Sequence, residues 1–267
     1  MVWADPREWA CEGQIVAALL RGYFEYWRLD LWKVIASEQV FDLPIINPAT
    51  GAEGKIFRLG GKLDKIVMLP DGRLALVEFK TASSPNEDYW NRLKIDTQIS
   101  EYFHAARRLG YDIQTVIYDV TAKPGLRPYK ATPMEDRKYT KEKRDKQGNI
   151  TEPSRLYANL READETPAEY GARVAADIAA YPEQYFFRRE IPRLEGDLLE
   201  YEYELWQTQQ LTRECQKAGR WFRNPSACLH PFPCEYREIC FQGLNPVEQL
   251  PEGFVTVPYV HQELLEE

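Results

Sequence analysis

The chain lacks the features that mark secreted, membrane and nucleic-acid-coating proteins. It has only five cysteines and three histidines in 267 residues, and its formal net charge is −8. No apolar run approaches the roughly 20 residues that span a bilayer, and the N-terminus lacks the basic-then-apolar pattern of a secretion signal. We therefore expect a cytoplasmic protein whose cysteines are thiols or metal ligands rather than disulfides. The negative charge argues against a general nucleic-acid coat but is compatible with a local basic groove.

The sequence does contain a regular order of helix and strand patterns, with no internal repeat. Hydrophobic residues make up 44% and charged residues 28% of the chain, as in an ordinary soluble globular protein. This order predicts an α/β or α+β fold, with one mixed sheet and helices on it, in a single domain over 1–267. The expected elements are a helix over 6–29, one or two strands over 30–46, a hairpin over 57–81, a helix over 86–110, a strand over 112–123, and helices over 166–181 and 194–219.

The expected helix over 86–110 has recognisable ends and an apolar stripe. Asn86 is a candidate N-cap and Gly110 a candidate C-terminal stop. Helical spacing places Ile95 and Ile99 on the buried side.

The hairpin allows the pairing of its strands to be predicted. A three-residue loop, Pro70–Gly72, with Gly72 at the positive-φ position, sets a register that places Asp64 opposite Glu78. Lys80 follows two residues later on the same face. A two-residue loop would shift the register by one and destroy this arrangement.

Two carboxylates in this position require an explanation. Directly opposed side chains have Cβ atoms about 4.5–5.5 Å apart, where like charges repel. Such a pair can clamp one divalent cation, and a nearby lysine can position a water or stabilise developing negative charge, as phosphodiester hydrolysis requires. The alternative is a simple ion pair of Lys80 with Asp64 or Glu78 at the rim of the sheet.

Three motifs together resemble a known family. The chain has "GGKLD", then "VEFKT" after a hairpin, then "QISEY" in the following helix. This pattern resembles the PD-(D/E)XK nuclease superfamily, and within it the RecB-like exonucleases and the nuclease of CRISPR adaptation. Many phage proteins of this kind also share "KPGLRP" and a Cys-rich tail. The resemblance covers most of 38–243 and implies a restriction-endonuclease-like core.

The resemblance assigns roles to the residues of the hairpin. It implies that Asp64 and Glu78 bind Mg²⁺ or Mn²⁺ with help from the main-chain carbonyl of Phe79, and that Lys80 serves the attacking water. Glu38 is a weaker candidate for a further acid near the metal.

The next helix matches the family's Gln-x-x-x-Tyr motif with Gln98 and Tyr102. These residues are one helical turn apart and share a face, so they are candidates to orient the lysine or a DNA phosphate. The alternative is that Tyr102 belongs to the core and Gln98 to the surface. The chain departs from the family because none of its histidines, at 104, 230 and 261, precedes the hairpin. Either this branch lacks the usual upstream histidine ligand or the sequence is shortened.

The tail over 223–243 predicts a metal centre. Cys228, Cys234 and Cys240 are separated by five residues each, and thiolates are ligands for zinc and iron–sulfur centres. Relatives carry a four-cysteine [4Fe–4S] cluster. The candidates for a fourth ligand are Cys11, ahead of Cys215, or His230 in a Cys₃His zinc site. The alternative is a purely structural tail.

The stretch over 125–160 is polar and basic, and we interpret it as a mobile insertion. Its candidate DNA-binding residues are Arg127, Lys130, Lys138 and Lys141. The alternative is a solvated loop. For Arg188 and Arg189 the alternatives are phosphate contact or a helix-end cap.

These observations predict a Mg²⁺- or Mn²⁺-dependent DNA exonuclease that acts on DNA ends or single strands in recombination, repair or CRISPR-type processing. DNA is the expected partner, and other proteins of those pathways are further candidates. A first alternative is an endonuclease or nickase of the same fold. A second is a non-catalytic module that binds DNA ends.

Overall fold

The computed structural model describes residues 5–229, 232–243 and 250–258. Its helices and strands are α1 Pro6–Tyr26, β1 Lys33–Ile46, β2 Glu53–Met68, β3 Leu74–Ala82, α2 Glu87–Arg92, α3 Thr97–Arg108, β4 Ile113–Ala122, β5 Lys143–Arg144, β6 Ile150–Glu152, α4 Pro167–Ala180, β7 Phe186–Ile191, α5 Glu195–Ala218 and α6 Arg237–Gln242. The chain forms two compact units, one made of Met1–Ser37, Asp64–Ile99 and Tyr111–Pro192, the other of Glu38–Leu63, Ser100–Gly110 and Arg193–Glu267. Within the described ranges, no helix is both long enough and apolar enough to cross a bilayer.

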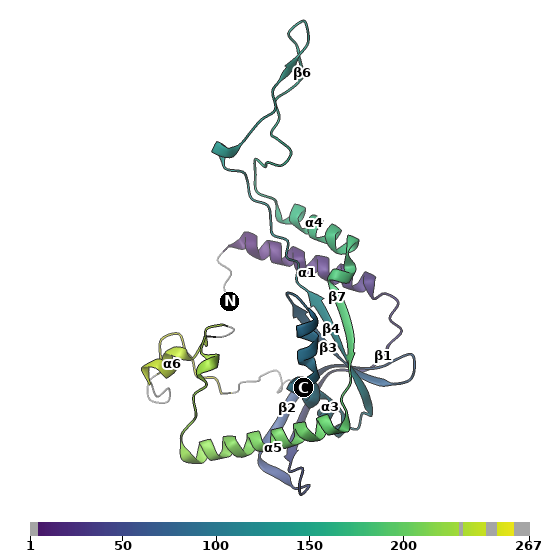
Figure 1. Cartoon of the computed structure of the whole chain (residues 1–267), viewed down its shortest axis with the longest axis vertical. Coiled ribbons are helices and arrows are strands. Elements are labelled where there is room, and N and C mark those ends of the chain that lie inside the picture. The colour runs from purple at the N-terminus through teal and green to yellow at the C-terminus, as the bar shows by residue number, and fades with distance from the viewer. Residues whose placement is uncertain (1–4, 230–231, 244–249, 259–267) are drawn as a thin grey trace. The chain divides into compact units, whose positions relative to one another are not determined.

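A five-stranded mixed sheet, in the order β1-β2-β3-β4-β7, is the centre of the fold (Figure 1). Strand β3 is parallel to β4, whereas β2 is antiparallel to β3 and β4 is antiparallel to β7. The predicted α/β class, with a mixed sheet flanked by helices, is confirmed, and the architecture is consistent with a restriction-endonuclease-like core.

The β2–β3 hairpin has the predicted three-residue loop. The N–H of Leu69 donates to the carbonyl of Arg73 at 2.8 Å, and Gly72 has a φ of +88°. The paired residues run from Met68 with Leu74 to Lys65 with Val77. This register is the predicted one, and it would place Asp64 opposite Glu78 one step beyond the observed pairs.

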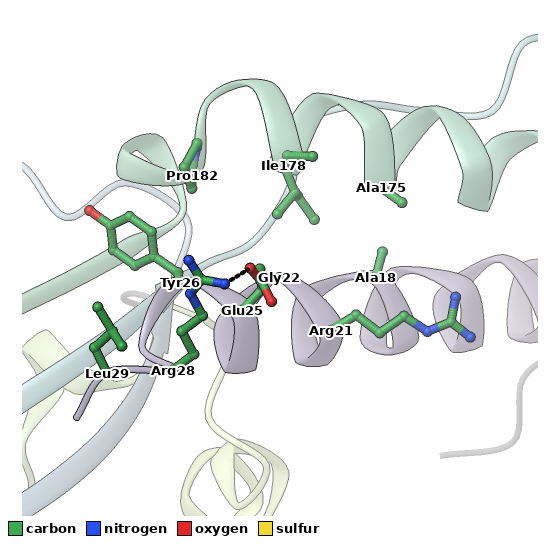
Figure 2. A pocket seen from close by; sticks show the side chains of 11 residues that line it. Ala18, Arg21, Gly22, Glu25, Tyr26, Arg28, Leu29, Ala175, Ile178 and Pro182 are labelled. Carbon is green, nitrogen blue, oxygen red and sulfur yellow. Dashed lines mark ion pairs between the residues drawn. The ribbon is translucent and has the colours of Figure 1, made fainter. Parts of the chain in front are cut away.

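Helices α1 and α4 pack against each other over small residues. Thr166 caps α4 through a capping box with Glu169. Figure 2 shows Ala18 and Gly22 of α1 facing α4. A Cβ at Gly22 would lie 2.5 Å from a methyl carbon of Ile178, so this approach needs glycine. The groove beside this contact is lined by residues of the two helices and their C-terminal turns.

The expected continuous helix over 86–110 is interrupted, which corrects the prediction. Asn86 caps α2 and Gly110 has a φ of +92°, as expected. The chain becomes extended at Asp96, whose carboxylate accepts a hydrogen bond from the N–H of Ile99 at 3.2 Å and starts α3. An aspartate favours this capping position over a helix interior. As a result Ile95 is 86% exposed, contrary to the prediction, whereas Ile99 is buried.

The edge strand β7 has no counterpart among the predicted elements. It carries Arg188, Arg189 and Glu190 between buried apolar ends, and these charges hide the alternation that predicts a strand. Charged side chains are common on edge strands because they discourage pairing with other chains.

Candidate active site

The predicted acids and lysine lie together on the β2–β3 hairpin, within one compact unit. Asp64 is on β2, and Glu78 and Lys80 are on β3. The Oδ2 atom of Asp64 accepts a hydrogen bond from the N–H of Phe79 at 3.1 Å. The Asp64 carboxylate therefore reaches across to β3 at the position of Glu78.

Glu78 is a buried acid with only half of its carboxylate paired. The residue is 3% exposed, and its Oε1 forms an ion pair with the Nζ of Lys80. Its Oε2 is buried and has no hydrogen-bond partner among the described residues. Burial raises the pKa of Glu78 to about 7; the Asp64 charge adds to this, and Lys80 opposes it. The ion pair considered as an alternative is thus present, but it leaves one oxygen without a protein partner.

This donor set fits a divalent cation. A buried carboxylate oxygen without a partner, next to a second carboxylate and a main-chain carbonyl at Phe79, offers hard oxygen ligands. In the part of the chain that the structure describes, no three His, Cys, Asp or Glu side chains gather in one place. Mg²⁺ commonly uses only one or two carboxylates and completes its shell with water and substrate phosphate.

Tyr118 is a neighbour of the site that the sequence did not assign to it. It lies beside Glu78 in the parallel β3–β4 register and is 4% exposed. Burial raises the pKa of Tyr118, and Tyr89 and Glu78 contribute in the same direction. Tyr118 could have been assigned to the site from the pairing of β3 with β4, but that pairing cannot be read from the sequence.

The Gln-x-x-x-Tyr pair lies on α3 as expected. Gln98 is half-buried, and the ring of Tyr102 meets the ring of Phe41 edge-on, with centroids 6.3 Å apart. That contact is also what a core tyrosine would make. Glu38 forms an ion pair with Lys62 and has a φ of +51°.

The cysteines do not form a centre within the described ranges. Cys11 is buried in the apolar cluster between α1 and α4, and Cys215 is on α5. The tail cysteines Cys228 and Cys234 are half-buried, and Cys240 is exposed. Their backbones approach each other, because the N–H of Cys234 donates to the carbonyl of Cys228 at 2.9 Å.

Of the three histidines, the structure describes only His104. The Nδ1 of His104 lies 3.1 Å from a carboxylate oxygen of Glu202, and the residue is buried. His230 and His261 lie outside the described residues.

Arg188 and Arg189 are neither helix caps nor open phosphate ligands, which corrects both interpretations. Arg188 stacks between Trp27 and Trp32, at 3.7 and 4.2 Å from the ring centroids, and its Nη2 donates to Asp119 at 2.6 Å. Arg189 pairs with Glu87 at 2.7 Å. Both arginines hold β7 in place.

The cations predicted to bind DNA differ in their pairing. Lys130 lies 3.5 Å from a carboxylate oxygen of Asp164. The side chains of Arg127, Lys138 and Lys141 have no ion pair within the described ranges, and both lysines are exposed. Three of the four are therefore available to an external anion.

Comparison with known proteins agrees with the geometry of the hairpin. A search of curated proteins gave no match. The family model of the PD-(D/E)XK nuclease superfamily matches residues 4–241, a range that includes the acidic pair, the lysine and the interrupted helix after them. The chain belongs to the PD-(D/E)XK nuclease superfamily.

Proposed function

We propose that the protein is a DNA exonuclease that depends on Mg²⁺ or Mn²⁺, with Asp64 and Glu78 as the metal-binding carboxylates. The observation that carries the proposal is the buried Oε2 of Glu78, which has no partner among the described residues and lies beside the Asp64 carboxylate. The Phe79 carbonyl is the proposed third protein ligand. The bound ion would neutralise phosphate charge and lower the pKa of a water.

Each protein group near the phosphate has a separate task in this proposal. Lys80 holds the attacking water by a hydrogen bond and offsets the negative charge that develops on the phosphate oxygens. Its ion pair with Glu78 keeps the ammonium at the site before substrate arrives. Gln98 and Tyr102, one turn apart on α3, orient Lys80 or the phosphate. The remaining proposed DNA contacts are Arg127, Lys130, Lys138 and Lys141.

The finer assignment to RecB-like or CRISPR-adaptation exonucleases rests on the resemblance of the three motifs. With this assignment we also propose a role in recombination, repair or CRISPR-type processing. The proposed protein partners are other proteins of these pathways. A [4Fe–4S] cluster on Cys228, Cys234, Cys240 and Cys11 is not supported by the described residues, since Cys11 lies in an apolar cluster. Metal analysis and absorbance at roughly 400 nm of anaerobically purified protein would detect a cluster or zinc.

The test of the proposed function separates metal binding from cleavage. Mn²⁺ binding is measured by calorimetry without DNA for the wild type, Asp64→Asn and Glu78→Gln, with the exposed Glu12→Gln as control. We expect binding to be lost in the first two variants and kept in the control. Metal binding by both carboxylate variants at the wild-type level would refute the proposed site.

Cleavage is then measured with 5′- and 3′-labelled linear DNA and with covalently closed circular DNA, with and without Mn²⁺. An exonuclease degrades only the linear DNA. Cleavage of the circle would favour the endonuclease alternative, and DNA binding without metal-dependent cleavage would favour the end-binding module.

A further inference from the structure

Residues 129–165 form a two-stranded ribbon, which we call the arm (Figure 1). Its two sides are joined by main-chain hydrogen bonds, from Thr132 to Arg161 at 2.9 Å and from Thr140 to Arg155 at 2.8 Å. Strands β5 and β6 continue the ladder to a turn that begins at Asp145. The predicted insertion therefore contains an antiparallel hairpin.

The base of the arm is fixed to the compact unit by buried charge. Glu165 is 3% exposed and accepts hydrogen bonds from Arg173 at 2.9 and 2.8 Å and from the N–H of Tyr129 at 2.8 Å. Arg7 of α1 pairs with Asp164 and donates to the Glu165 carbonyl at 2.7 Å. These contacts fix the direction in which the arm leaves α4.

The outer part of the arm has nothing of its own to pack against. No residue between Pro133 and Ala158 is buried. An isolated two-stranded ribbon is marginally stable in water. A partner that lies along the ribbon would supply packing contacts that stabilise the outer arm, which the chain itself does not supply.

The outer arm carries an excess of available positive charge. Residues 138–157 contain six Lys and Arg against three Asp and Glu, in a chain with a net charge of −8. All three acids are engaged: Glu142 by Arg144, Glu152 by Lys143, and Asp145 by N–H groups of its own turn. The cations without an ion pair within the described ranges are Lys138, Lys141, Lys146 and Arg155.

These cations are distributed over both faces of the ribbon. Lys138 faces Tyr157 and Thr140 faces Arg155 across the ladder, which puts Lys138 and Arg155 on one face. Tyr139 and Lys141 alternate onto the other face, where Tyr139 pairs with Leu156. The cations can therefore meet phosphates on two sides of the ribbon.

The chain enters the arm from the same end of the sheet that carries the proposed site. Strands β3 and β4 are parallel, and they end together, where the N–H of Lys123 donates to the carbonyl of Ala82 at 2.8 Å. Lys80 is two residues before the end of β3, and the chain enters the arm a few residues after Lys123. A polymer held by the arm can thus extend toward Lys80.

We propose that the arm grips double-stranded DNA by lying in its major groove, with Lys138, Lys141, Lys146 and Arg155 on the flanking phosphates. The major groove is about 12 Å wide and admits a two-stranded ribbon, and duplex phosphates border it on both sides. A single strand would instead need bases stacked on aromatic rings in a row, whereas Tyr139 and Tyr157 are on opposite faces. The proposal rests on the proposed nuclease function and narrows its substrate to duplex DNA.

The test is a binding measurement in EDTA, which keeps cleavage out of the result. Fluorescence anisotropy gives the affinity of the full chain for a labelled blunt duplex and for the matching single strand over a series of salt concentrations. The test variant is Lys138→Gln/Lys141→Gln, with one cation from each face. The control is Lys55→Gln/Arg213→Gln, which removes the same charge from exposed positions in the other unit.

We expect the test variant to lose at least about tenfold in duplex affinity at roughly 0.1 M salt, and the slope of log K against log salt to become shallower by about 2. Single-strand affinity should change by less than about threefold, and the control should match the wild type.

Unchanged duplex affinity, or an equal loss in the control, would overturn the role of the arm. An equal loss for the single strand would overturn the assignment to duplex DNA. A wild-type protein that binds through the arm yet does not cut DNA with Mn²⁺ would refute the nuclease function and leave the arm proposal standing.

Discussion

Replacing Glu78 with glutamine should remove a pH-dependent instability of the metal-free protein. Burial raises the pKa of Glu78 from 4.5 to about 7. The folded state then holds a proton that the unfolded state has lost, so stability falls as pH rises from about 4.5 to about 7. A shift of about 2.5 pKa units at about 1.4 kcal/mol per unit amounts to roughly 3.5 kcal/mol in all. A neutral glutamine cannot contribute this slope.

Urea unfolding in EDTA at about pH 5 and about pH 8 measures the effect. The loss of free energy of unfolding between the two conditions should be about 2.5 kcal/mol smaller in Glu78→Gln than in the wild type, because part of the effect lies below pH 5. Glu87→Gln, at an exposed acid whose pKa is lowered by Arg189, should not reproduce this change. Equal pH dependence in the wild type and Glu78→Gln would show that the fold does not disfavour the charged form of Glu78, and the cation argument would lose its basis. Adding Mn²⁺ at about pH 8 should stabilise the wild type and leave Glu78→Gln unchanged.

Three further substitutions test other parts of the structure. Lys80→Ala should reduce metal-dependent cleavage by at least about a hundredfold with an unchanged circular dichroism spectrum; near-normal turnover would remove the lysine from the mechanism. Arg188→Ala should destabilise the protein by about 3–5 kcal/mol in urea, because it leaves Asp119 as an unpaired buried charge; a loss below about 1 kcal/mol would contradict that assignment. Asp96→Ala should cost about 1 kcal/mol through the lost cap of α3, whereas Asp96→Asn should restore most of it; no difference between the two would argue against capping.

The sequence predicted the parts of the fold that depend on neighbouring residues. The loop Pro70–Gly72 fixes the hairpin because glycine alone readily takes its φ of +88°, and the register from Met68–Leu74 to Lys65–Val77 follows from it. Asn86 and Gly110 set helix ends for similar local reasons.

The parts of the fold and of the candidate site that the sequence did not predict depend on residues far apart in the chain. Strand β7 is defined by its pairing with β4 and by the stacking of Arg188 between Trp27 and Trp32, neither of which leaves a periodic pattern. Tyr118 reaches the site only because β4 lies next to β3. At Asp96 the chain can either continue the helix or cap a new one. The spacing of apolar residues alone does not decide between these two outcomes.

The β2–β3 hairpin and the arm differ in how well they tolerate a change in the length of their turns, because the loop Pro70–Gly72 sets the register of β2 against β3. One inserted or deleted residue there would shift the register of β2 against β3 by one and turn the side chain of Asp64 to the other face of the sheet, away from Glu78. The turn at the tip of the arm has no such constraint, because no buried side chain depends on its alternation. Changes in length are therefore tolerated at the tip of the arm, whereas the loop Pro70–Gly72 is constrained to three residues.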